Sequence, residues 1–227
     1  MTQGFLGGTP ENFTTTLGRE GSDYTAAIFG YSLNAESVTI WKDVPGVLNA
    51  DPRYFPDAEK IEVLSYHEAI EMTYYGATVI HPKTIKPLQN KKIPLYVRSF
   101  VNSKEEGTCI SEGFVGSNVT RTNTFPVLVL KPDQMLISME AKDFSFIAEE
   151  NLSYIFSVLS KYRVKVNMMQ NAAISFSVCA DRDEKIAPML KELSESFTVK
   201  SNDHLQLLTI RHYSEDLVEK YAAGKEI

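Results

Sequence analysis

Hydrophobic positions along this 227-residue chain alternate between the spacing of helices and the spacing of strands. Tyr24, Ala27, Ile28 and Tyr31 recur at helical spacing, which predicts a helix from Ser22 to Leu33. The same analysis predicts a strand at 37–41, a brief apolar segment at 61–64, helices at 65–75 and 82–90, and a strand at 93–98. This order of elements is typical of a layered α/β domain.

The second half of the chain follows a different pattern. Residues 107–124 form a polar, glycine-bearing stretch, where we expect a domain boundary that separates residues 1–116 from residues 117–227. Beyond it we predict strands at 125–130, 135–139, 164–168, 174–178, 197–199 and 205–210, and helices around 152–159, 186–193 and 216–222. The order strand, helix, strand, strand, helix, strand predicts a ferredoxin-like fold.

The stretch from Thr14 to Asp23, TTTLGREGSD, has the pattern of a strand, a loop and a helix start. Ser22 and Asp23 are placed to cap the helix, and the unpaired N–H groups of a helix start attract anions. Two interpretations remain open from the spacing alone: an anion-binding junction, and an ordinary capped helix after a glycine loop.

Composition excludes several functional classes. The net charge is −6 and basic residues form no run, so the sequence predicts neither a nucleic-acid partner nor a membrane surface. The two cysteines and four histidines match no metal-binding spacing, and we predict no metal held by them. No apolar run is long enough to span a bilayer and no signal segment is visible, so we expect a cytoplasmic protein.

Several motifs in one order resemble a known family. TLGREGSD is similar to the T-x-x-L-G-R-G-G-S-D signature of aspartokinases, in the amino-acid kinase superfamily. GFLG, IWKDVPGV, DPR, LSYHEAIEM, YGATVIHPKTI and IPLYVRSF also resemble aspartokinase segments and occur in the family order. Residues after about 117 resemble the paired ACT regulatory domains of that family, with the first unit nested in a second, truncated one. The resemblance implies a partial amino-acid-kinase α/β domain followed by ferredoxin-like ACT domains.

The resemblance implies the activity of an aspartate kinase, which transfers the γ-phosphoryl group of MgATP to the β-carboxylate of L-aspartate. This is the first step of lysine, threonine and methionine biosynthesis. A carboxylate is already a nucleophile, so the enzyme has to position groups and neutralise charge. By the family pattern, Arg19 and Ser22 hold aspartate, and Asp23 is the catalytic residue that orients a lysine or the Mg²⁺ ion. The planar fork of Arg19 suits a carboxylate better than a lysine would.

The family pattern also implies a nucleotide site, with ATP as the cosubstrate. Asp43 is expected at the ribose and Arg53 at a phosphate, although either is also a common turn residue. Leu48 stands where the family usually has a tyrosine, Thr78 stands where it usually has a lysine, and Glu20 replaces a loop glycine. The predicted ATP-binding set is Lys42, Asp43, Leu48, Arg53, Thr78 and Val79.

The departures and the missing motifs shape the remaining expectations. No segment matches the family's K-x-G-G phosphate loop, so we expect a fragment that is inactive alone. The resemblance implies an effector amino acid as a partner at the ACT region. Glu150, Asn167 and the Ala172–Ala173 pair depart from the pattern of lysine-sensitive relatives, so we expect lysine feedback to be weak or absent.

Two alternatives stay open: another kinase of the superfamily, and a non-catalytic ACT protein that binds amino acids or dimerises. ACT units commonly pair, and we predict a homodimer through residues 125–210.

Overall fold

The computed structural model describes residues 1–77, 80–112, 125–143 and 145–226, and it divides the chain into two compact units. The first unit joins Met1–Val129 to the C-terminal segment Thr209–Ile227, and the second comprises Leu130–Leu208. The predicted domain limit between residues 116 and 117 lies outside the described residues and stays a prediction. None of the described helices is long and apolar enough to cross a membrane.

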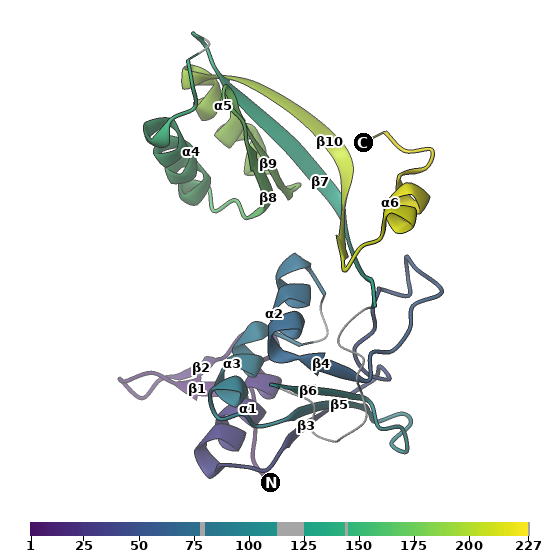
Figure 1. Cartoon of the computed structure of the whole chain (residues 1–227). Helices are drawn as coiled ribbons and strands as arrows, with labels where there is room; N and C mark the ends of the chain where they lie inside the picture. The colour runs from purple at the N-terminus through teal and green to yellow at the C-terminus, as the bar shows by residue number, and fades with distance from the viewer. Residues whose placement is uncertain (78–79, 113–124, 144, 227) are drawn as a thin grey trace. The chain divides into compact units, whose positions relative to one another are not determined.

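The first unit is built on a four-stranded mixed sheet (Figure 1). Its strands lie in the order β3 (Val38–Lys42), β5 (Leu95–Ser99), β6 (Thr108–Ser111) and β4 (Val63–Ser65). The pairs β3–β5 and β4–β6 are parallel, whereas β5–β6 is antiparallel. A separate hairpin of β1 (Leu6–Gly8) and β2 (Thr14–Thr16) precedes the sheet. β2 is the strand predicted at the start of the Thr14–Asp23 stretch, whereas the glycine-rich β1 was not predicted.

Three helices cover one face of this sheet: α1 (Gly21–Leu33), α2 (Tyr66–Tyr75) and α3 (Pro82–Asn90). Ala27, Ile85 and Leu88 from the helices pack with Leu95 and Val97 from the central strand, and all five are buried. Burial at alternate positions of β5 follows from the two-residue period of a strand, which points successive side chains to opposite faces. The layered α/β prediction is confirmed for this unit.

The start and the packing face of α1 differ from the prediction. The N-cap residue is Glu20, in a left-handed conformation with φ 58° and ψ 27°, and Ser22 and Asp23 lie inside the first turn. The buried positions of α1 are Gly21, Ala27 and Gly30, whereas the predicted apolar face leaves Ile28 and Tyr31 exposed. The helix is apolar on several faces, so its hydrophobic pattern did not identify the side that packs. Small residues allow the close approach to β3 and α3.

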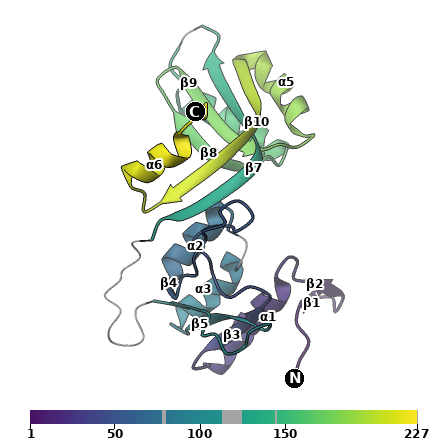
Figure 2. The same cartoon turned by 90° about the vertical axis from the view of Figure 1, so that its right-hand side faces the viewer.

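The second unit has the predicted ferredoxin-like order (Figure 2). Its elements are β7 (Val127–Ala141), α4 (Glu149–Lys161), β8 (Val166–Asn171), β9 (Ser175–Asp181), α5 (Ile186–Ser196) and β10 (Phe197–Arg211), with the strands ordered β10-β7-β9-β8. Ile137, Val178 and Phe176 from the sheet pack on Ile155 and Leu193 from the two helices. A final helix, α6 (Glu215–Ala222), belongs to the first unit.

Two pairs of predicted strands are single long strands in the structure. The segments at 125–130 and 135–139 join in β7, and those at 197–199 and 205–210 join in β10. Polar residues interrupt the apolar alternation in both, at Asp133 and His204, and each has a positive φ, of 51° and 57°. The predicted polar boundary stretch also begins with a strand, β6, whose Thr108 is fully buried. A sequence pattern does not show that a polar residue has found hydrogen-bond partners in a core.

Candidate functional site

The N-terminal end of α1 lies beside the C-terminal end of β3, and an ion pair joins them. The Lys42 ammonium is 2.9 Å from Oδ2 of Asp23, and the two side chains are 21% and 14% exposed. Asp23 occupies the first turn of α1, where the helix dipole favours a negative charge. Among the described residues, Lys42 forms an ion pair with this carboxylate. Oδ2 of Asp23 accepts no hydrogen bond from them. That Asp23 orients a lysine or a metal ion in catalysis stays a prediction.

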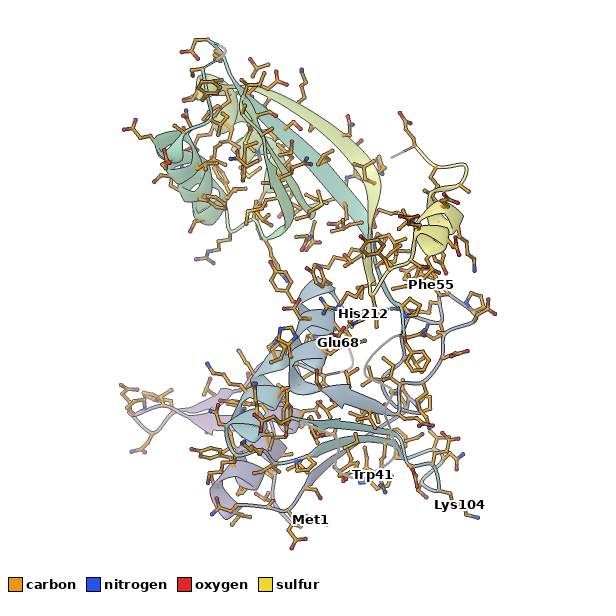
Figure 3. All side chains as sticks on the ribbon, in the orientation of Figure 1. Met1, Trp41, Phe55, Glu68, Lys104 and His212 are labelled. Carbon is orange, nitrogen blue, oxygen red and sulfur yellow. The ribbon has the colours of Figure 1, made fainter. Side chains whose placement is uncertain are left out.

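The strand that carries Lys42 is held firmly on one side. β3 pairs in register with β5, Lys42 lies opposite Ser99, and the backbone N–H of Phe100 donates to the Lys42 carbonyl at 2.8 Å. Trp41, the preceding residue, points from the opposite face of the strand and is labelled in Figure 3. Because Lys42 ends the strand, its side chain reaches past the sheet toward α1 while its backbone stays in the ladder.

The loop that follows β3 is fixed by a residue that the sequence did not single out. Thr108 is fully buried, and its hydroxyl accepts from the backbone N–H of Val47 at 2.8 Å and donates to the carbonyl of Ile61 at 2.6 Å. Leu48, half-buried, bridges to Lys60 in the same loop. The sequence offered one signal for Thr108, a β-branched residue in a short run before Cys109 and Ile110. Because Thr108 directly follows Gly107, this segment also has the pattern of a turn.

The predicted substrate and nucleotide residues fall into separate groups. Arg19 and Ser22 lie at the start of α1, and Asp43 directly follows β3. All three residues are exposed. Arg53 instead makes its ion pair inside its own turn: its guanidinium bonds both oxygens of Asp51, the closest contact being 2.6 Å. Thr78 and Val79 lie outside the described residues, so their placement stays a prediction.

Arg53 is therefore available to an anion only in competition with Asp51. Its side chain is 75% exposed, and the hydrogen bonds from Arg53 lower the pKa of Asp51 below its ordinary value. The same hydrogen bonds raise the pKa of the Arg53 guanidinium. Since exposed ion pairs contribute little free energy, an approaching phosphate can exchange with Asp51 at small cost.

No group of three or more metal-ligating side chains occurs among the residues that the structure describes. The four histidines lie apart: His67 is exposed on α2, His81 caps α3, His204 contacts Arg182, and His212 contacts Glu68. His81 accepts at Nδ1 from the N–H of Lys83 at 3.0 Å.

Comparisons with known proteins find similarity along the whole chain. The model of the amino acid kinase family matches residues 1–99. Lysine-sensitive aspartokinase 3 of Escherichia coli is 31% identical over 239 residues, covering 100% of this chain and 51% of that protein. A bifunctional aspartokinase/homoserine dehydrogenase of Zea mays is 37% identical over 182 residues, covering 80% of this chain and 20% of that protein.

Solved structures give the same result. E. coli aspartokinase III in complex with lysine and aspartate superposes with a TM-score of 0.75 at 29% identity, covering 99% of this chain and 52% of that one. The same enzyme in complex with aspartate and ADP gives 0.73 at 31% identity, covering 92% and 47%. The chain thus spans about half the length of these E. coli aspartokinases.

Proposed function

This chain belongs to the amino acid kinase family as a relative of the aspartokinases, and we propose that it takes part in the phosphorylation of L-aspartate. In this reaction the γ-phosphoryl group of MgATP passes to the β-carboxylate of aspartate. The observation that supports the proposal is the Asp23–Lys42 pair at the junction of α1 and β3, inside a segment that is similar to aspartokinases throughout.

The residues present suit two anionic substrates. A carboxylate nucleophile needs no base, so the protein has to bring two negatively charged molecules together and reduce their repulsion. Exposed Arg19 and Ser22 adjoin the N–H groups of the first turn of α1, where we propose that they hold the aspartate carboxylate.

Lys42, oriented by Asp23, and Arg53, released from Asp51, are the proposed phosphate contacts. Mg²⁺ is proposed to enter as part of the MgATP substrate, bound to its phosphates.

Calorimetry with MgADP and with L-aspartate on the 227-residue chain tests this proposal. Lys42→Met is expected to weaken MgADP binding by roughly tenfold, because one charged contact to a phosphate is lost. Lys92→Met is the matched control: Lys92 is also paired with a carboxylate, Glu112, but lies 75% exposed at the other end of β5. Equal affinities for the wild type and the Lys42 variant would contradict the proposed role.

Turnover is measured in the same samples by coupled ADP release, with aspartate compared against glutamate and acetylglutamate. The prediction that this chain has no turnover by itself is tested there. ADP release with another acceptor would instead support the alternative of a different kinase of the superfamily.

A second candidate function is an amino-acid-binding or dimerising module, and the second unit favours it. Its sheet and two helices form a hydrophobic core separate from that of the first unit. If an amino acid binds to the chain while MgADP does not, this second function is the one supported.

We also propose that lysine binds this unit weakly. The carboxamide of Asn167 is already engaged: its Nδ2 donates to Gln134 and to Asp181, each at 2.8 Å, and its oxygen accepts from Lys131 at 2.7 Å. A ligand at Asn167 would have to break these bonds, each of which involves a buried or charged group. A lysine titration followed by calorimetry tests this, and micromolar affinity would contradict it.

A homodimer through the second unit is proposed as well. β8 is an edge strand whose Met168 and Met169 are 42% and 60% exposed, which leaves backbone and apolar surface for pairing with another copy. Light scattering at high concentration tests this proposal, and a monomeric mass would contradict it.

A further inference from the structure

A pocket of about 440 Å³ opens in the first unit, apart from the α1–β3 junction. Its walls are the segment 49–59, residues 125–128 and one face of α6, all of which belong to the same compact unit. None of its described lining residues belongs to α1 or β3. The volume lies in the range of small-molecule sites, so the pocket is a candidate binding site in addition to the proposed substrate site.

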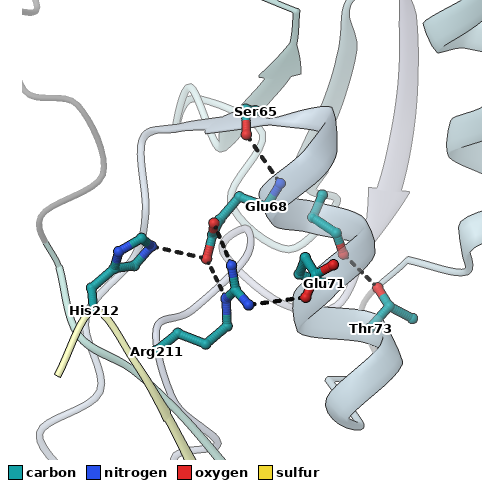
Figure 4. A network of polar contacts seen from close by, with 7 residues as sticks. Ser65, Glu68, Glu71, Thr73, Arg211 and His212 are labelled. Atoms are coloured by element: carbon teal, nitrogen blue, oxygen red, sulfur yellow. Dashed lines mark hydrogen bonds and ion pairs between the residues drawn. The ribbon is translucent and has the colours of Figure 1, made fainter.

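The wall that α6 forms is attached to the rest of the first unit at two points. Arg211, shortly before α6, donates from Nε to Oε1 of Glu68 on α2 at 2.7 Å and from Nη2 to Oε2 at 2.9 Å (Figure 4). The Glu68 side chain is 6% exposed, and the hydrogen bonds from Arg211 lower its pKa. On α6 itself, the ring of Tyr221 contacts that of Phe55 edge to face, with 5.6 Å between the ring centroids.

The opposite wall is ordered by Asn49, which is half-buried. Its Oδ1 accepts from the backbone N–H of Glu59 at 2.7 Å, and its Nδ2 donates to the carbonyl of Pro126 at 3.3 Å. The backbone carbonyl of Asn49 accepts from the N–H of Leu128 at 2.8 Å. These hydrogen bonds join the segment 49–59 to the start of β7, so the pocket is formed without a ligand.

Aromatic side chains form much of the lining. The four aromatic residues are Tyr54, Phe55, Phe125 and Tyr221. Tyr54 and Phe125 are each 42% exposed, so their rings are accessible to a ligand, whereas Tyr221 and Phe55, which is labelled in Figure 3, are half-buried. Aromatic rings pair favourably in edge-to-face and offset-stacked geometry, so this lining suits a ligand that carries an aromatic ring.

Three charged side chains of both signs complete the lining: Asp57, Glu59 and Lys220. Among the described residues, none of the three takes part in an ion pair. Nζ of Lys220 lies 5.4 Å from the centroid of the Tyr221 ring, beside the aromatic part of the lining. Unpaired charges of opposite sign around an aromatic pocket complement a ligand that carries both an ammonium and a carboxylate.

We propose that this pocket binds a free amino acid with an aromatic side chain. The ring of the ligand lies among the four aromatic residues, its carboxylate pairs with Lys220, and its ammonium pairs with Asp57 and Glu59. A zwitterion pairs with charges of both signs, whereas a simple cation would leave Lys220 without a partner. The site goes beyond the proposed function and does not depend on it, because no proposed substrate contact is among the described lining residues.

Calorimetry with L-phenylalanine on the 227-residue chain tests the proposal, and three further probes each lack one group. Phenethylamine lacks the carboxylate, phenylacetate lacks the ammonium, and L-alanine lacks the ring. L-Phenylalanine is expected to bind with a dissociation constant of about 1 mM or lower. Each of the other probes is expected to bind at least roughly tenfold more weakly, because each loses one charged or aromatic contact.

Lys220→Met removes the proposed partner of the carboxylate and keeps a side chain of similar length. It is expected to weaken L-phenylalanine binding roughly tenfold and to leave phenethylamine binding unchanged, because that probe has no carboxylate. Lys225→Met is the matched control: Lys225 is also exposed, follows α6 in the sequence and is not among the described lining residues. It should bind every probe as the wild type does, and Trp41 fluorescence verifies that both variants have folded.

Three results would overturn the proposal. These are a dissociation constant for L-phenylalanine above about 1 mM, equal affinities for L-phenylalanine and L-alanine, and unchanged L-phenylalanine binding in the folded Lys220→Met protein. Saturating L-aspartate separates this pocket from the proposed substrate site, and it is expected to leave L-phenylalanine binding unchanged. Displacement by L-aspartate would mean that L-phenylalanine occupies the substrate site, and it would also overturn the proposal.

Discussion

Gly30 lies in α1 where the helix contacts β3 and α3, and replacing it with alanine sets two effects against each other. In an exposed helix, alanine is more favourable than glycine by about 1 kcal/mol. Here an added Cβ would lie 2.4 Å from Cγ2 of Val38 and 3.3 Å from Cδ2 of Leu88. Contacts between carbon atoms are normally near 3.5–4.0 Å, so the new methyl group forces the neighbours to move.

The steric effect is expected to dominate. Val38 is buried, and its β-branched side chain has few alternative rotamers, so it cannot turn away freely. Overpacking of this kind costs about 1–3 kcal/mol. After subtracting the helix-propensity gain, Gly30→Ala should lower the free energy of unfolding by about 1 kcal/mol.

Urea unfolding followed by Trp41 fluorescence measures this change in the first unit alone, because Trp41 lies in β3 and is the single tryptophan. Val38→Ala provides the control, since it removes the methyl group that the new Cβ would meet. The double variant should be more stable than the sum of the two single changes predicts, by about 2 kcal/mol, because the steric cost is removed while the helix-propensity gain stays. A Gly30→Ala protein as stable as the wild type, or strictly additive effects in the double variant, would refute this reasoning.

Three further variants test contacts of the first unit with the same unfolding measurement. Ser65→Ala removes the side-chain acceptor of the α2 N-cap and should cost about 1 kcal/mol; a change near zero would refute the cap. Glu68→Gln should cost about 3 kcal/mol at pH 7. Because Arg211 lowers the folded-state pKa of Glu68, that contribution is complete above the unfolded-state pKa of about 4.3. It is lost as the pH falls through the lower, folded-state value. A cost that stays constant down to pH 3 would therefore contradict the assignment. Lys42→Met leaves Asp23 without its partner and should cost about 1.5 kcal/mol, whereas no loss would mean that water replaces the ammonium.

Local signals in the sequence predicted much of the fold. The helices predicted at 22–33 and 65–75 match α1 (Gly21–Leu33) and α2 (Tyr66–Tyr75), which are bounded by the local cap residues Asn34, Ser65 and Gly76. The ferredoxin-like order followed from the alternation of two periods in the second half. These features depend on residues a few positions apart, so the printed sequence contains nearly all the information that fixes them.

Hydrophobic periodicity was less informative where a helix is apolar on several faces or a strand contains polar residues. It identified Ala27 correctly as a core position of α1, but it also favoured Ile28 and Tyr31, which are exposed, and it missed Gly30 and Gly21. It placed Thr108 in a polar linker, although that side chain is buried and holds the loop after β3. Packing density and hydrogen-bond satisfaction decided these cases, and both depend on neighbours distant in the sequence.

The sequence by itself determined the family resemblance, the candidate anion-binding junction at residues 14–23, and the order of most elements, with β1 and β6 as the strands that it missed. The tertiary structure decided which charged side chains meet from different elements: Asp23 with Lys42, and Glu68 with Arg211, 143 residues away. The physical reason is that a helix or strand forms through contacts between near neighbours. An ion pair forms only where the packed elements bring its two charges within about 4 Å, and that arrangement belongs to the fold as a whole.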